Sequence, residues 1–195
     1  NQVDFLPTDP GKLLVRMMDD EDTVVSLRDL KKETEIELFS TGDPFTGYLL
    51  EDGRFVFVEN RSESVRAYVS DGKTEAERVL KADQISYLPV LNSFLTVEYE
   101  DEEAIYTLFD LQGNETVVLF QGEGLGNWLI TPDGRLMAAV VESDDGAEVQ
   151  LIDTRSGEVI STNDRYSGIA GLFSAARGSP VYFYGEDEDG FLSLE

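Results

Sequence analysis

Apolar residues gather in short runs separated by polar, turn-rich gaps, and this pattern recurs along the chain. The clearest copy predicts four strands, at Phe45–Leu50, Arg54–Glu59, Ser64–Val69 and Ala76–Leu80. Val, Ile, Phe, Tyr and Leu dominate these runs, which is typical of β-strands. No segment shows a convincing helical period. The pattern therefore predicts an all-β chain.

The same strand order is predicted in the other copies. The first copy opens with a strand at Val3–Leu6 and ends near Phe39. The remaining predicted strands are Ile85–Val90, Phe94–Glu98, Ala104–Phe109 and Thr116–Phe120 in the third copy, Asn127–Ile130, Leu136–Val141, Glu148–Ile152 and Glu158–Ser161 in the fourth, and Ile169–Phe173, Val181–Tyr184 and Phe191–Leu194 in the fifth.

Tight turns between the first two strands of each copy set the period. They contain Gly11, Gly53, Asn92, Gly134 and Gly178, about forty residues apart. Gly and Asn are the residues that a hairpin needs where φ is positive. We expect these five residues to occupy such turns.

Four short antiparallel strands in every forty or so residues are typical of a β-propeller blade. A barrel or a sandwich does not predict a constant four-strand period. We expect one propeller over residues 1–195, with blades at about 1–40, 41–81, 82–121, 122–162 and 163–195. The fifth blade lacks a predicted fourth strand, and open sheet edges are an aggregation liability. We therefore expect part of a larger ring of about six to eight blades; the alternative is a five-bladed ring closed in another way.

Two motifs of the fourth copy resemble the repeats of TolB-like propellers, and more loosely those of WD-repeat propellers. Thr131–Leu136 contains a Pro-Asp-Gly-basic turn, and Val149–Val159 contains Asp-x-x-x-Gly. The second copy matches in part, at Glu51–Arg54 and Ser70–Gly72, and the third keeps Asp110–Gly113. The resemblance implies a blade and an extracytoplasmic location. It also implies a protein-docking platform, a solute binder, or a gating domain attached to a peptidase.

Composition excludes several classes of partner and of catalytic site. Forty acidic residues against 15 basic ones give a net charge of −25, which repels nucleic acid and anionic membranes. No apolar run approaches the roughly 20 residues of a membrane-spanning helix. The chain has no Cys and no His. That composition excludes thiol nucleophiles, Ser-His-Asp triads and most zinc sites. We expect no enzyme activity and no cofactor.

The predicted strand order sorts the charges. The connections between second and third strands, residues 19–22, 59–63, 98–103, 142–148 and 185–190, hold 19 acids and a single base, Arg61. In an antiparallel meander these connections share one rim. A cationic protein partner on this acidic rim is one interpretation. Solubility or adaptation to high salt is the other.

Several groups are candidate ligand-binding sites. Trp128, Arg165 and Tyr166 lie in segments that approach the channel mouth, where an aromatic and a cation could hold a ligand or could equally serve blade packing. Two acidic loops resemble calcium loops incompletely and are better explained as hairpins; they contain Asp144 and Asp145, and Asp187 and Asp189.

Two further motifs do not support a site. Residues 121–126 mimic a nucleotide-binding glycine loop, but no helix follows, so we expect an inter-blade loop. Among so many acids, a pair of carboxylates at the spacing of a glycosidase arises by chance.

The leading hypothesis is a non-catalytic propeller that binds a protein partner and lies outside the cytoplasm. One alternative is a propeller that gates or positions substrate for the catalytic domain of a larger peptidase-type hydrolase. Another is a sugar- or ion-binding propeller with weak affinity for calcium.

Overall fold

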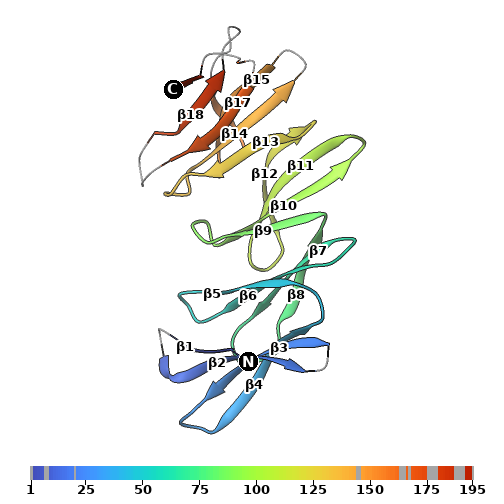
Figure 1. The fold of residues 1–195 in the computed structure, drawn as a ribbon, viewed down its shortest axis with the longest axis vertical. Helices are drawn as coiled ribbons and strands as arrows, with labels where there is room; N and C mark the ends of the chain where they lie inside the picture. The colour runs from blue at the N-terminus through green and yellow to red at the C-terminus, as the bar shows by residue number, and fades with distance from the viewer. Residues whose placement is uncertain are drawn as a thin grey trace. The chain divides into compact units, whose positions relative to one another are not determined.

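The computed structural model describes residues 2–6, 9–19, 21–143, 146–162, 166, 168–174, 180–186 and 192–194. Every regular element in these ranges is a β-strand (Figure 1). The described residues contain no helix long and apolar enough to cross a membrane. The all-β prediction is confirmed.

The strands form five antiparallel sheets, four with four strands and one with three. In each sheet the strands lie side by side in chain order, so each sheet is a simple meander of hairpins. This is the predicted blade pattern. The chain also divides into two compact units, residues 1–85 and 86–195.

The first unit contains two four-stranded sheets. Their strands are β1 (Gln2–Leu6), β2 (Asp9–Asp19), β3 (Asp22–Asp29) and β4 (Thr34–Thr41), then β5 (Phe45–Leu49), β6 (Phe55–Asn60), β7 (Val65–Ser70) and β8 (Glu77–Ala82).

The second unit contains the other three sheets, and its boundary falls within the first strand of the third sheet. The strands are β9 (Gln84–Leu88), β10 (Ser93–Glu100), β11 (Glu103–Phe109) and β12 (Glu115–Gly122), then β13 (Leu125–Ile130), β14 (Leu136–Ser143), β15 (Gly146–Asp153) and β16 (Val159–Thr162), then β17 (Gly168–Phe173), β18 (Tyr182–Glu186) and β19 (Leu192–Leu194).

The turn residues explain why the hairpins form where they do. Gly53, Asn92 and Gly134 have φ values of 87°, 51° and 72°, the left-handed conformation that the sequence predicts for them. Gly11 was wrongly expected in such a turn. It lies within β2, because Leu6 already pairs with Asp9 and the hairpin therefore closes before Gly11. The fifth predicted turn residue, Gly178, lies outside the described residues.

The core of the first unit is an aromatic cluster between its two sheets. Phe39 of β4 stacks on Phe57 of β6, with ring centroids 4.7 Å apart and planes 8° apart. Phe45 and Tyr68 pack against Phe39 at 5.2 and 5.0 Å. Such pairs add about 0.5–1.5 kcal/mol each to the burial of their apolar area. The first and second sheets are therefore joined face to face.

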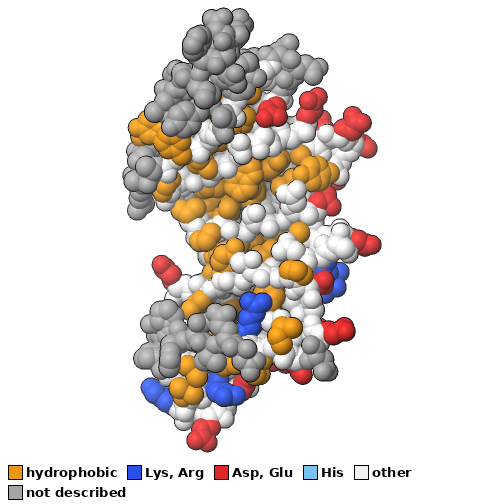
Figure 2. All heavy atoms as spheres, viewed as in Figure 1, with side chains coloured by type: hydrophobic (Ala, Val, Ile, Leu, Met, Phe, Trp, Pro, Cys, Tyr) orange, Lys and Arg blue, Asp and Glu red, His pale blue; other side chains and the backbone are white. Residues whose placement is uncertain are grey.

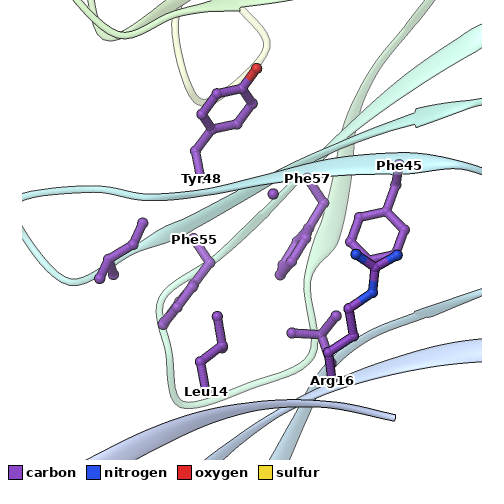
Figure 3. Close-up of a pocket in the computed structure, with 9 residues that line it drawn as sticks. Leu14, Arg16, Phe45, Tyr48, Phe55 and Phe57 are labelled. Atoms are coloured by element: carbon purple, nitrogen blue, oxygen red, sulfur yellow. The ribbon is translucent and has the colours of Figure 1, made fainter. Parts of the chain in front are cut away.

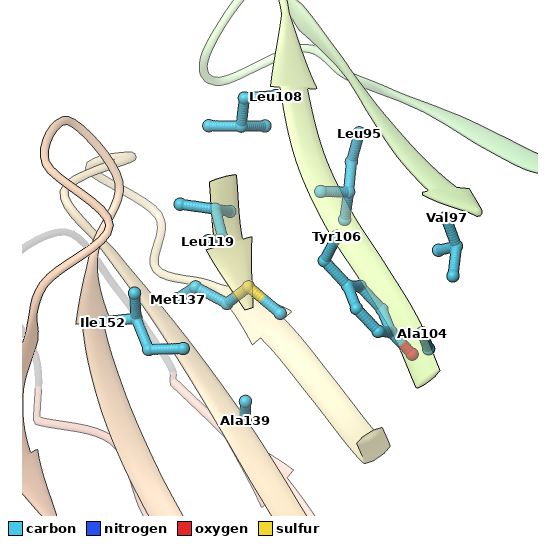
Figure 4. Close-up of a cluster of buried hydrophobic side chains, with 9 residues drawn as sticks. All are labelled: Leu95, Val97, Ala104, Tyr106, Leu108, Leu119, Met137, Ala139 and Ile152. Atoms are coloured by element: carbon cyan, nitrogen blue, oxygen red, sulfur yellow. The ribbon is translucent and has the colours of Figure 1, made fainter. Parts of the chain in front are cut away.

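The core of the second unit has two layers, one on each face of the fourth sheet. On one face Met137 and Ala139 meet β10 and β11, and Figure 4 shows Met137 reaching toward Tyr106. On the other face Val140 packs with Phe183 of the fifth sheet. All residues from Met137 to Val140 are fully buried. Strand β14 is thus covered on both faces of the sheet, as in stacked blades.

Candidate functional site

The two ends of each four-stranded sheet differ in their chemistry. Because neighbouring strands are antiparallel, the hairpin between the second and third strands lies at one end of its sheet, and the other two hairpins lie at the opposite end. We call the second-to-third hairpins β2–β3, β6–β7, β10–β11 and β14–β15 the acidic hairpins. The remaining hairpins are called the opposite hairpins.

Aspartates of the opposite hairpins are committed to turn structure. In the third-to-fourth hairpins, one carboxylate oxygen accepts backbone N–H bonds from residues two to four positions further on. Asp71 accepts from Lys73 at 2.8 Å and from Thr74 at 3.1 Å. The same arrangement occurs at Asp29, Asp110 and Asp153.

The first-to-second hairpins use aspartate in a related way. Asp52 accepts from the backbone N–H of Arg54 at 3.1 Å and from its Nε at 2.8 Å. Asp133 accepts from the Thr131 hydroxyl at 2.7 Å and from the backbone N–H of Arg135 at 3.1 Å. These bonds stabilise the ionised form of the acceptor.

The pKa values of these aspartates shift accordingly. The backbone N–H of Lys32 lowers the pKa of Asp29, and that of Lys73 lowers the pKa of Asp71. The pKa values of three more are lowered mainly by side-chain hydrogen bonds, for Asp52 from Arg54, for Asp110 from Asn114 and for Asp133 from Thr131. These carboxylates are therefore turn elements, and each has at least one oxygen already bound to its own turn.

Seven carboxylates of the acidic hairpins are free by comparison. The following have no hydrogen bond or ion pair with another described residue: Glu21, Asp22, Glu63, Glu98, Glu100, Asp101 and Glu102. The densest group is the β10–β11 hairpin, where Asp101 and Glu102 form the tip with φ values of 47° and 74°. Acidic side chains stand exposed on the face of the molecule shown in Figure 2. These carboxylates remain available to a partner.

Three carboxylates of the acidic hairpins do have partners. Glu103 accepts from Gln121 Nε2 and Glu148 accepts from Gln150 Nε2, both at 2.7 Å.

Glu59 is the third, and it is buried, with 1% of its surface exposed. The predicted acidic rim includes Glu59, and its burial corrects that prediction. Its Oε2 accepts from Arg61 Nε at 2.7 Å and from the Tyr68 hydroxyl at 2.9 Å, and its Oε1 accepts from the Thr41 hydroxyl. Arg61 Nε also lies 3.2 Å from Asp43 Oδ2.

Burial acts to raise the pKa of Glu59, but the hydrogen bonds from Arg61, Thr41 and Tyr68 outweigh it, so the pKa lies below its ordinary value. Arg61, the single base of the predicted acidic rim, is thus paired with Glu59 and Asp43. It does not offset the free carboxylates.

Two of the predicted site residues are described, and both pack between sheets. Trp128 is half-buried against the core between the third and fourth sheets. Tyr166 exchanges two backbone hydrogen bonds of 2.8 Å with Ala147, and its ring meets Phe183 edge-on at 5.2 Å. The other five predicted residues, Arg165, Asp144, Asp145, Asp187 and Asp189, lie outside the described residues.

The glycine-rich segment and the acidic loops do not form a binding site among the described residues. Residues 121–126 join β12 to β13 with no helix, as expected of an inter-blade loop. Within the described ranges, no group of three or more acidic side chains is placed to hold a metal ion. The calcium hypothesis for the two incompletely described loops stays a prediction.

Comparison of the structure with solved structures identifies the fold. The β-propeller domain of the trilobed protease from Pyrococcus furiosus matches with a TM-score of 0.53 and 13% identity, over 94% of this chain and 64% of that one. A eukaryotic initiation factor structure matches with a TM-score of 0.58 and 13% identity, over 91% and 46%. TolB from Acinetobacter baumannii matches with a TM-score of 0.48 and 17% identity, over 95% and 51%.

The likeness to the protease propeller domain confirms the predicted fold: the chain is part of a β-propeller. It spans about half the length of the TolB and initiation-factor chains that it matches. No protein-family model matches the sequence, and no curated protein matches it.

Proposed function

We propose that this chain is a non-catalytic binding propeller whose acidic hairpins contact a cationic protein surface. The observation that carries the proposal is the contrast between the two ends of the sheets. Aspartates of the opposite hairpins are used by their own turns, whereas seven carboxylates of the acidic hairpins, among them Glu100, Asp101 and Glu102, have no partner among the described residues. Ionised groups without internal partners are the ones that complementary charges on another protein can use.

The charge and composition of the chain support the same proposal. A net charge of −25 steers cationic partners toward the protein and repels anionic ones. The chain lacks His and Cys, the residues of the commonest nucleophilic and proton-transfer sites. The described aspartates with shifted pKa values lie in turns, where hydrogen bonding accounts for the shifts.

The test compares two double variants that remove equal charge from the second unit. Glu100→Gln/Glu102→Gln neutralises the β10–β11 acidic hairpin. Glu115→Gln/Glu158→Gln neutralises two exposed glutamates of the opposite hairpins. Association with a synthetic lysine-rich peptide is measured by stopped-flow fluorescence at low and at physiological salt.

We expect the first variant to slow association about three- to tenfold at low salt and the second to leave it nearly unchanged, with the difference shrinking as salt screens the charges. Equal effects of the two variants would show that only net charge matters. The acidic hairpins would then be a solvated surface and not a binding one.

The alternative function is a propeller that gates or positions substrate for an attached hydrolase domain. Its support is the likeness in fold to the propeller domain of a protease, which shows architecture alone at 13% identity. Sequencing of the complete gene tests it: a hydrolase domain in the same polypeptide would favour gating. An extracytoplasmic location belongs to the proposal as well, and cell fractionation with an antibody tests it.

A further inference from the structure

An apolar pocket of about 190 Å³ lies between the two sheets of the first unit. Its walls come from β2 and β3 of the first sheet and from β5 and β6 of the second (Figure 3). Phe55, Phe57 and Val25 at its floor are buried, whereas Arg16 and Gly47 at its edge are exposed. The pocket therefore has a closed apolar base and an open, charged mouth.

Gly47 lines the edge of the pocket. Along β5, Phe45, Gly47 and Leu49 share one face of the strand, and Tyr48 points to the other (Figure 3). Gly47 pairs with Phe57, and a Cβ atom there would lie 3.3 Å from Phe57 Cδ1. Its φ is not positive, so the backbone does not require glycine. The missing side chain lets the Phe57 ring pack directly against the backbone of β5.

Arg16 supplies a cation at the mouth. Its guanidinium carbon lies 4.8 Å from the centroid of the Phe45 ring, a cation–π contact. No carboxylate of a described residue lies within ion-pair distance of it. The cation is thus placed to receive an anion from outside.

We propose that this pocket binds a small carboxylate whose apolar part is the size of one aromatic ring. An apolar cavity of about 150 Å³ is enough to hold benzene, so this pocket of about 190 Å³ accommodates a single ring. The ring would lie against Phe55 and Phe57, and the carboxylate would pair with Arg16, for which a planar guanidinium is suited. This site is independent of the acidic hairpins and takes a ligand of the opposite charge.

Three probes separate the contributions of the ring and of the carboxylate. Phenylacetate carries both the ring and the carboxylate, 2-phenylethylamine replaces the anion by a cation, and acetate lacks the ring. Binding to the full chain is followed by chemical-shift changes in two-dimensional NMR. We expect phenylacetate to bind with a Kd on the order of 1 mM, typical of a ligand with so few atoms, and to shift the amides of residues 45–49 and 55–57. The other two probes should bind at least tenfold more weakly.

Variants assign the site. Arg16→Gln should weaken phenylacetate about tenfold, whereas Arg28→Gln, which removes a guanidinium already paired with Glu35, should leave the Kd unchanged. Gly47→Leu fills the pocket and should abolish binding. If Gly47→Leu does not fold, Gly47→Ala takes its place. This smaller side chain should weaken phenylacetate binding without abolishing it.

Equal binding of phenylacetate and 2-phenylethylamine would overturn the proposal, as would an unchanged Kd in Arg16→Gln. Preference for a peptide with a C-terminal phenylalanine over phenylacetate would also overturn it, because the site would then recognise a polypeptide.

Discussion

Replacing Glu59 by glutamine tests the buried network at the β6–β7 hairpin. Glutamine keeps the shape of the side chain but removes its charge and turns one acceptor oxygen into an NH₂ group. That NH₂ group must then face the Arg61 guanidinium, which donates to both oxygens of Glu59. The substitution thus weakens the charge-assisted bonds and places two donors against each other.

The expected loss follows from the burial and the partners. Hydrogen bonds to a charged group contribute about 1.5–3 kcal/mol, and glutamine retains some of them. The ion pair itself adds little, because the Arg61 side chain is 40% exposed and solvent screens it. We therefore expect Glu59→Gln to lower the free energy of unfolding by about 2–3 kcal/mol at pH 7. Glu63→Gln, on the same hairpin but without a partner among the described residues, is the matched control and should have no measurable effect.

Acidity gives the experiment a second readout. The pKa of Glu59 is lowered in the folded chain, so its ionised form adds stability that is present above the ordinary carboxylate pKa and is lost as pH falls through the folded-state value. Glutamine does not titrate. The stability difference between wild type and Glu59→Gln, measured by urea unfolding with far-UV circular dichroism, should therefore shrink between pH 5 and about pH 2. A difference that is the same across this range, or no larger than that of Glu63→Gln, would refute this account of the network.

Two further predictions concern backbone conformation, and both are measured by urea unfolding. Gly157→Ala should cost about 3 kcal/mol or more, because φ is +73° and a Cβ atom would overlap the Val118 carbonyl oxygen; Gly53→Ala, at φ +87° with open space around it, should cost only about 1 kcal/mol. Equal losses would show that the close approach to Val118 is unimportant. Glu33→Gly should stabilise the chain by up to about 1 kcal/mol, because Glu33 has a φ of +54° at the position that Gly157 holds in the fourth sheet. A loss of stability would mean that the Glu33 side chain contributes more than its backbone strain costs.

Much of the fold was predictable because its determinants are local. Hairpins at Gly53, Asn92 and Gly134 are set by a few adjacent residues, and positive φ was expected and found at each. The strand order follows once the hairpins are known, because consecutive antiparallel strands pair with each other. Gly11 was misplaced because Leu6 pairs with Asp9 earlier in the chain, and this choice depends on the register of the whole hairpin.

The candidate sites depended on contacts between sheets, which the sequence pattern does not contain. The apolar pocket joins β2 to β5, so neither strand alone reveals it. Two features of the sequence mark the pocket. Arg16 interrupts the otherwise apolar run of residues 13–18, and Gly47 has no side chain between Phe45 and Leu49. The burial of Glu59 was equally hidden, since a glutamate that ends a strand is usually solvated. Its partner Thr41 belongs to the preceding sheet.

The aspartate turns of the third-to-fourth hairpins have a consequence for how such a repeat changes during evolution. Each turn is closed by its own aspartate carboxylate. A short segment copied from one repeat to another therefore contains every residue that its turn needs. The packed faces differ, with phenylalanines in one unit and leucine, methionine and alanine in the other. A duplicated repeat would form its turns at once. Its packed side chains would fit the neighbouring sheets only after further substitutions.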